Sequence, residues 1–244
     1  MAVIEEYQDY LDQHPGCEQT SGHISAALRL GNLYLDIDQV DSAVDSIVAT
    51  VNFPFIWDNL TEDMIDVVVE LLRRAMNIDH TSSKILQALD QLLEEKSLTS
   101  QFSWFKGDLI ELKGVWFQEN GHLEEALGHY NLLHSHVMEH PDRDEAMEAW
   151  SLSRISLVLF HQHRYKEALK NFKRVLELDE ASTKDSEEIF ENYINIAITY
   201  WKLEDYWGSF ECSQMSKFKF PTALSDELCA TSCHSTIYPF QLNT

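Results

Sequence analysis

The stretch NGHLEEALGHY at residues 120–130 decides the fold of this chain, because it recurs. It returns as HRYKEALKNF at residues 163–172 and, more faintly, as EDYWGSF at residues 204–210. The small residues Ala126, Ala168 and Ser209 are 42 and 41 residues apart, and Ala43 lies 83 residues before Ala126, about two such periods. A fixed period in this range is typical of an array of helical repeats.

The composition supports a folded helical protein with an acidic surface. Only 8 of the 244 residues are glycine and 5 are proline, which argues against disorder and against a strand-rich fold with many turns. The net charge is −23, and the acids are spread along the chain rather than gathered in a block. We interpret most of them as solvated helix faces, with a basic partner as the alternative. Nucleic acid and anionic membrane surfaces are excluded as partners, because both require clustered lysine and arginine.

The compartment is predicted from what the chain lacks. The start MAVIEE has neither the basic residues nor the apolar segment of a signal peptide. No apolar run approaches the roughly 20 residues that span a bilayer. The four cysteines are scattered, which favours reduced thiols. We therefore expect a cytoplasmic protein, with the nucleus as the alternative.

Hydrophobic periodicity predicts an all-α fold of ten or eleven helices. An amphipathic helix at 3–13 comes first, followed by a hairpin whose first helix begins near Ile24 and whose second spans 40–51. A hairpin without the repeated phrase follows at 61–78 and 83–95, with Thr61 as its N-cap. The remaining helices are predicted at 102–119, 123–139, 145–161, 165–178, 186–203 and 206–218.

The apolar positions of these hairpins resemble the tetratricopeptide repeat family, in its long-period variety similar to kinesin light chain repeats. Lys113 replaces the family's leucine, Thr50 and Leu133 replace its last small residue, and the period exceeds the usual length of about 34 residues. The matching positions, repeat by repeat, are Ala27, Leu30, Gly31, Tyr34, Ala43 and Ile47; Ile110, Gly114, Phe117, Ala126 and Tyr130; Leu152, Ile155, Ser156, Leu159, Ala168 and Phe172; and Tyr193, Ile196, Ala197, Tyr200, Ser209 and Pro221.

The resemblance implies a right-handed α-solenoid of stacked antiparallel hairpins. We expect a capping helix and linker at 1–23, a repeat domain at 24–220 and an irregular tail at 221–244. The repeats are placed at 24–57, 61–96 (degenerate), 102–140, 145–180 and 186–220. Small residues at one register of each helix let neighbouring helices approach closely, so we interpret them as packing residues and not as a site.

The resemblance also implies a non-enzymatic adaptor or scaffold, a subunit of a larger assembly without a cofactor. In the family, the first helix of each repeat lines a concave groove that binds partners. We expect a mixed-charge groove that takes a helix or an extended, basic-to-neutral segment. The residues projected onto it are Arg29, Asn32, Asp36, Asp108, Glu111, Arg154, Leu157, Glu191, Asn195, Ile198 and Lys202.

Aromatic residues crowd the last repeat, where a solenoid ordinarily carries a polar cap. The residues of this predicted end-docking patch are Trp201, Trp207, Phe210, Phe218 and Phe220. Uncovered apolar surface marks interaction sites. We expect this end to dock on a second copy as a homodimer, on another subunit, or on more chain in a longer protein.

Two alternatives to the adaptor stay open. The first is a regulatory sensor whose array responds to a peptide. The second is a zinc-dependent protein: His136, Glu139 and His140 match the H-x-x-E-H pattern, in which two histidines one turn apart hold zinc. A structural zinc is a further reading of Cys229, Cys233 and His234, with Cys212 as a remote fourth ligand. No metal is our main expectation.

Overall fold

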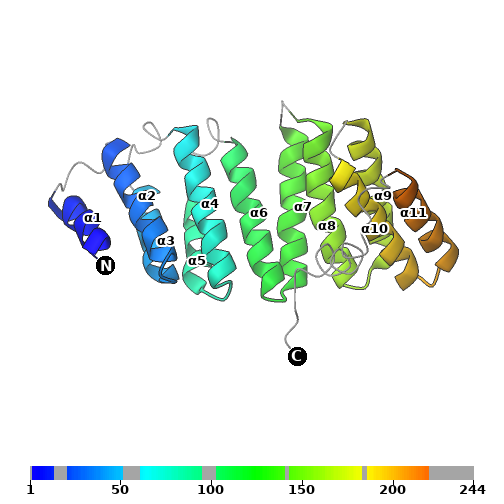
Figure 1. The fold of residues 1–244 in the computed structure, drawn as a ribbon, viewed down its shortest axis with the longest axis horizontal. Helices are drawn as coiled ribbons and strands as arrows, with labels where there is room; N and C mark the ends of the chain where they lie inside the picture. Colours follow the sequence, from blue (N-terminus) through cyan, green and yellow to red (C-terminus); the bar gives the residue numbers. More distant parts are fainter. Residues whose placement is uncertain are drawn as a thin grey trace. The chain divides into compact units, whose positions relative to one another are not determined.

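The computed structural model describes residues 2–13, 21–51, 61–94, 103–140, 143–182 and 186–219, and all secondary structure within these ranges is helical. Figure 1 labels the eleven helices. They are α1 (Ala2–Gln13), α2 (Ser21–Leu35), α3 (Val40–Val51), α4 (Glu62–Ile78), α5 (Ser83–Glu94), α6 (Ser103–Glu119), α7 (Leu123–Glu139), α8 (Glu145–His161), α9 (Tyr165–Ala181), α10 (Ser186–Lys202) and α11 (Tyr206–Lys219).

The prediction of an all-α chain of sequential helix hairpins is confirmed. The hairpin without the repeated phrase is present as α4 and α5, and Thr61 caps α4 by accepting a hydrogen bond from the Met64 amide at 3.3 Å. The largest differences are of three residues: α9 ends at Ala181 instead of residue 178, and α2 begins at Ser21 instead of near Ile24. The arrangement is a solenoid like that of tetratricopeptide repeats.

The helices form two compact units, Met1–Gly121 and His122–Thr244. In the first unit, α4 packs against both α2 and α3, and α6 packs against α4 and α5. Figure 1 shows α2, α4 and α6 as successive neighbours in this unit. Their exposed sides therefore form one continuous surface, and α3 and α5 pair behind them.

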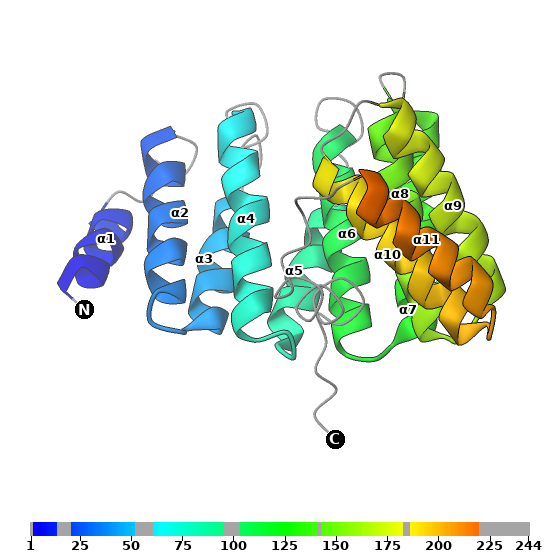
Figure 2. The ribbon, with the colours of Figure 1, turned by 45° about the vertical axis from the view of Figure 1, so that its right-hand side comes forward.

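In the second unit, each helix packs against the next one along the chain, from α7 to α11. Figure 2 shows α10 and α11 lying together at the end of this series. Tyr130 and Phe172, the large residues of the repeated phrase, are fully buried (0% exposed). They pack beside the small residues Ala126 and Ala168, which are equally inaccessible.

The small residues act as the register analysis predicts. Ala43 is 0% exposed, and a Cβ atom at Gly31 would lie 3.5 Å from the Ala43 carbonyl oxygen. This close approach between α2 and α3 leaves room for a hydrogen or a methyl group but not for a longer side chain. These residues therefore belong to the packing of the hairpins.

The turn inside most hairpins contains one residue in the left-handed region. The backbone φ angle is +56° at Asp38, +76° at Gly121, +61° at His163 and +61° at Glu204. The amide of the residue that follows closes the motif at three of these turns, for example from Arg164 to the Leu159 oxygen at 2.9 Å. This is the Schellman arrangement, which favours glycine because it has no Cβ atom. The repeated phrase thus includes a turn signal as well as packing residues.

We expect Glu204→Gly to raise the free energy of unfolding by about 0.5–1 kcal/mol, because it removes left-handed strain from an exposed residue. Gly121→Ala should lower it by about 1 kcal/mol for the opposite reason. Urea denaturation followed by circular dichroism measures both changes.

Asp79→Gly is the matched control. Asp79 occupies the equivalent turn between α4 and α5, but its φ angle is −144° and its carboxylate accepts a hydrogen bond from the Thr81 amide at 3.0 Å. This variant should be destabilised. Equal effects of glycine at positions 204 and 79 would contradict the interpretation.

Candidate protein-binding surface

The exposed sides of α2, α4 and α6 form the surface that we call the A-helix surface. Helix α4 runs through its middle, and buried residues of α4 alternate with an exposed stripe at helical spacing. Neighbouring positions on this stripe are three or four residues apart, so they share one face. The stripe consists of Asp63, Asp66, Val67, Glu70 and Arg73, and the half-buried Arg74 lies beside it.

Two arginines of α4 link it to the helices on either side. Arg74 donates hydrogen bonds to Asn32 of α2 and, at 3.0 Å, to the carboxylate of Asp36, the residue just after α2. Arg73 lies 3.4 Å from the Glu111 carboxylate of α6. Ion pairs in contact with solvent contribute little stability. They do, however, neutralise the positive charge of both arginines with carboxylates of the same protein.

The carboxylates of the A-helix surface outnumber its arginines. Among the described residues, no cation pairs with Asp66 or Glu70. Burial, with a smaller contribution from the charge of Glu111, raises the pKa of Asp108 to about 6, although the Arg73 guanidinium opposes the rise. The negative charge on this side of α4 and α6 is therefore only partly compensated.

A hollow of about 610 Å³ lies at the N-terminal end of this surface, between α1, α2 and α4. Arg29 and Asn32, two of the predicted partner-binding residues, line it. Its other lining residues are mostly apolar and include Leu33, Met64 and Val67. The surface thus combines an apolar end with an acidic middle.

The structure distributes the predicted partner-binding residues over both units. In the first unit, Arg29 and Asp36 are exposed, Asn32 and Asp108 are half-buried, and Glu111 is only 2% exposed. In the second, α8 and α10 carry the others: Lys202 is exposed, Asn195 is 4% exposed, and Arg154, Leu157, Glu191 and Ile198 are half-buried. Glu111 and Asn195 therefore lie within the helix packing, which makes them poor candidates for contact with a partner.

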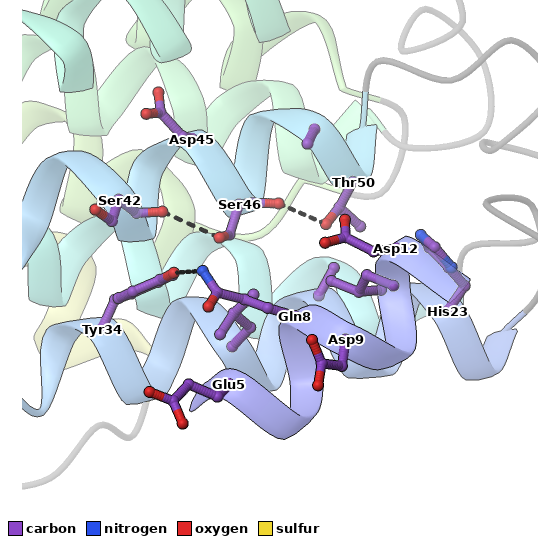
Figure 3. Close-up of a pocket in the computed structure, with 14 residues that line it drawn as sticks. Glu5, Gln8, Asp9, Asp12, His23, Tyr34, Ser42, Asp45, Ser46 and Thr50 are labelled. Carbon is purple, nitrogen blue, oxygen red and sulfur yellow. Dashed lines mark hydrogen bonds between the residues drawn. The ribbon is translucent and has the colours of Figure 1, made fainter. Parts of the chain in front are cut away.

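Sequence reasoning missed a second cavity, of about 830 Å³, between α1, α2 and α3 (Figure 3). Glu5, Asp9 and Asp12 of α1 lie on one side of it, and Ser42, Ser46 and Thr50 of α3 lie on the other. The hydroxyls of Ser46 and Thr50 donate to carbonyl oxygens of their own helix, at 3.0 and 2.8 Å. Helical spacing within each segment hints at these faces, but only packing brings them together.

The predicted end-docking patch lies on α10 and α11. Trp201 is 60% exposed, Trp207 is 69% and Phe210 is 53%. Tyr206, at 57%, joins them, and its ring packs edge-on to Trp201 at 5.0 Å between centroids. Phe220 and the side chain of Phe218 lie outside the described residues.

The metal-binding motifs find no support within the part of the chain that the structure describes. His136 lies in the last turn of α7, and His140 is the C-cap of this helix, with an extended ψ angle. No three His, Cys, Asp or Glu side chains gather there in a group that could hold a metal ion. Cys229, Cys233 and His234 lie outside the described residues. None of the described helices has the length and apolarity to cross a membrane.

Comparison with known proteins agrees with the architecture. Residues 145–215, from α8 into α11, match the family model for the tetratricopeptide repeat. The stacked hairpins define the chain as a helical repeat protein. The matched segment is a tetratricopeptide repeat, and the fold of the chain is similar to that of kinesin light chain-like repeat proteins. A search of curated proteins finds no match.

Solved structures share the fold at low sequence identity. BtubC (BKLC) from P. vanneervenii has a TM-score of 0.61 at 13% identity, over 89% of this chain and 87% of its own. A putative kinesin light chain from Podosopora anserina, with nearly identical TPR-like repeats, has 0.58 at 15% identity, over 83% and 97%. A Rap protein complexed with competence and sporulation factor has 0.58 at 13% identity, over 96% and 63%. Repeats of this fold typically bind proteins or peptides and are usually non-catalytic.

The pKa of Asp108 leads to a testable pH dependence. The folded chain holds this proton up to a pH of about 6, whereas the unfolded chain releases it near the ordinary value of 3.8. Ionisation of Asp108 therefore lowers the free energy of unfolding as the pH rises from about 4 to 6. The whole of this loss of stability is present above pH about 6.

We expect Asp108→Asn to be more stable than the wild type at pH 7.5 by about 1–2 kcal/mol, because the amide carries no charge to bury. The difference should vanish below about pH 4, where the carboxyl is protonated in both states. Urea unfolding at the two pH values measures it. If the difference in free energy of unfolding between the variant and the wild type were the same at both pH values, this assignment would be contradicted.

Proposed function

We propose that this chain is a non-catalytic adaptor that binds a basic-to-neutral protein segment, helical or extended, on its A-helix surface. The observation that carries the proposal is the partly compensated negative charge beside α4. Asp66 and Glu70 are exposed there without a cation partner in the described part of the chain, and Asp108 retains its proton up to pH about 6. A lysine or arginine of a partner supplies the missing positive charge.

Charge alone steers a partner, whereas apolar contact holds it. The hollow beside Arg29 offers Leu33, Met64 and Val67 as apolar lining, and Val67 is 43% exposed. A segment with one apolar anchor followed by basic residues matches this order of features along the surface. Amphipathic helices and extended peptides both satisfy it.

In the second unit, we propose that side chains of α8 and α10 form a separate contact site. Lys202 is exposed and Glu191 is half-buried, so this surface offers both signs of charge. Leu157 and Ile198 add apolar area. A contact with such mixed character selects sequence more by shape and apolar fit than by net charge.

Charge reversal on α4 tests the main proposal. Peptides selected from a random twelve-residue display library on the wild-type chain should carry net positive charge. A selected peptide should bind Asp66→Lys with Glu70→Lys at least about tenfold more weakly, by fluorescence anisotropy, because two attractions become repulsions. Its affinity for the wild type should also fall as salt is raised.

The matched control places the same change in net charge elsewhere. Glu94→Lys with Glu125→Lys alters exposed residues of α5 and α7, which do not belong to the A-helix surface. This double variant should bind the peptide as the wild type does. Selected peptides without a charge bias, or equal binding by both double variants, would refute the proposed surface.

The end-docking patch supports a second candidate function, assembly of two copies of the chain. Phe210 corresponds in the repeat to Leu169 of α9, which is half-buried in a helix that α10 packs against. The same register position is 53% exposed in α11. Lys202 and the acids Asp205 and Glu211 are exposed around it, so two copies related by a twofold axis can pair opposite charges.

Light scattering tests this second candidate. The wild type should be a dimer at micromolar concentration, and Trp207→Gln with Phe210→Gln should be a monomer of unchanged helicity. Val3→Gln with Tyr10→Gln is the control, because it removes exposed apolar side chains from α1 instead. A wild type that stays monomeric as its concentration is raised would rule out the dimer.

A further inference from the structure

The N-terminal helix α1 is attached by few buried side chains. Ile4 is its only buried residue among those described, whereas α4 buries seven residues and α5 buries four. Tyr7 and Leu11 are half-buried against the core, and Val3 is 51% exposed. Since burial of apolar area is the main source of docking free energy, α1 is held more weakly than these internal helices.

Side-chain hydrogen bonds supplement the contact, and at least two of them join α1 to α2. Gln8 donates to the hydroxyl of Tyr34, as Figure 3 shows. Arg29 donates to the hydroxyl of Tyr7 at 3.4 Å. Arg29 is one of the residues that line the apolar end of the A-helix surface. The docked α1 therefore engages part of the surface that we assign to the partner.

Hollows flank α1 on both sides. The cavity of about 830 Å³ separates it from α3, and the hollow of about 610 Å³ separates it from α4. A third, of about 500 Å³, is lined by Val3, Glu6 and Tyr10. Within the array, by contrast, α4 contacts α2 and α3 directly. Open space of this size means that α1 forgoes the lateral packing that fixes an internal helix.

A helix of 12 residues also gains little from its own hydrogen bonds. Isolated helices shorter than about 12–15 residues are marginal in water. Segments with few buried apolar contacts open at a low free energy, while the rest of the structure remains folded. Docking on α2 and helix formation in α1 are therefore expected to be coupled, and to be lost together.

From these observations we propose that α1 is a reversible intramolecular ligand of α2. Docked, its Val3 and Tyr7 form one wall of the hollow at the N-terminal end of the A-helix surface, and the Tyr7 hydroxyl accepts a hydrogen bond from Arg29; undocked, it leaves that end open to a partner. This regulation rests on the proposed partner-binding function. A partner that uses this end binds with an affinity reduced by the fraction of chains in which α1 is undocked. Weakening α1 docking therefore strengthens partner binding.

The test uses the full chain and a labelled peptide with the sequence of residues 2–13, blocked at both ends. The peptide competes with α1 for α2. Ile4→Ala in the chain removes the buried anchor of the intramolecular helix, so the peptide should bind this variant about tenfold or more tightly than it binds the wild type. Asp12→Asn is the matched control, because Asp12 is exposed on the same helix, and it should leave the peptide affinity unchanged.

Hydrogen exchange on the wild-type chain is the second measurement, and it needs no variant. The amides of α1 should exchange at least about a hundredfold faster than those of α4, because undocking does not require the array to unfold. Equal protection of the two helices, or equal peptide affinity for all three chains, would overturn the proposal. Peptide binding that dissociates a dimer of the wild type would also overturn it, since α1 would then dock on a second copy.

This experiment is independent of the residues that test the proposed function. The peptide measurement involves α1 and α2, whereas the charge reversals lie on α4. If α1 proves to be rigidly docked while charge reversal on α4 still weakens peptide binding, the partner surface stands and only its regulation by α1 is refuted. If α1 undocks but charge reversal on α4 leaves peptide binding unchanged, the partner surface is refuted and the undocking of α1 stands.

Discussion

The close approach of paired helices at small residues is the constraint on which the rest of the structure depends. Ala43, Ala126 and Ala168 are fully buried, and Gly31 faces Ala43 across the hairpin of α2 and α3. Because no long side chain separates the helices there, large neighbours such as Tyr130 and Phe172 can fill the space beside them. Each hairpin then offers an apolar side that only another hairpin can cover.

That dependence explains why the two ends of the chain differ from its interior. An internal helix such as α4 is covered by neighbours on several sides, and its exposed residues reduce to a single stripe. At the N-terminus, α1 meets α2 and is flanked by hollows. On α11, aromatic side chains stay exposed at positions that are half-buried earlier in the repeat. Among the described residues, no further helix covers the outer side of α1 or α11, and both proposals for binding at the ends rest on this observation.

The A-helix surface shows how a packed scaffold creates an electrostatic feature. Arg73 and Arg74 are close in sequence, yet one pairs toward α6 and the other toward α2. Both arginines form ion pairs with carboxylates outside α4, and the carboxylates of Asp66 and Glu70 have no such partners among the described residues. The burial of Asp108 completes this arrangement, because a partly desolvated carboxyl retains its proton more strongly.

The sequence by itself determined the helices, their pairing and the register of the packing residues, because periodicity and turn residues are local properties of the chain. It also projected Arg29 and Asn32 onto the partner-binding side, and both line the hollow beside α4. Only the tertiary structure decided that Glu111 and Asn195 are buried, that Arg73 and Arg74 pair in opposite directions, and that cavities flank α1. Exposure and ion pairing depend on side chains from helices far apart in sequence. The residue pattern of a single helix does not specify which side chains of other helices pack against it.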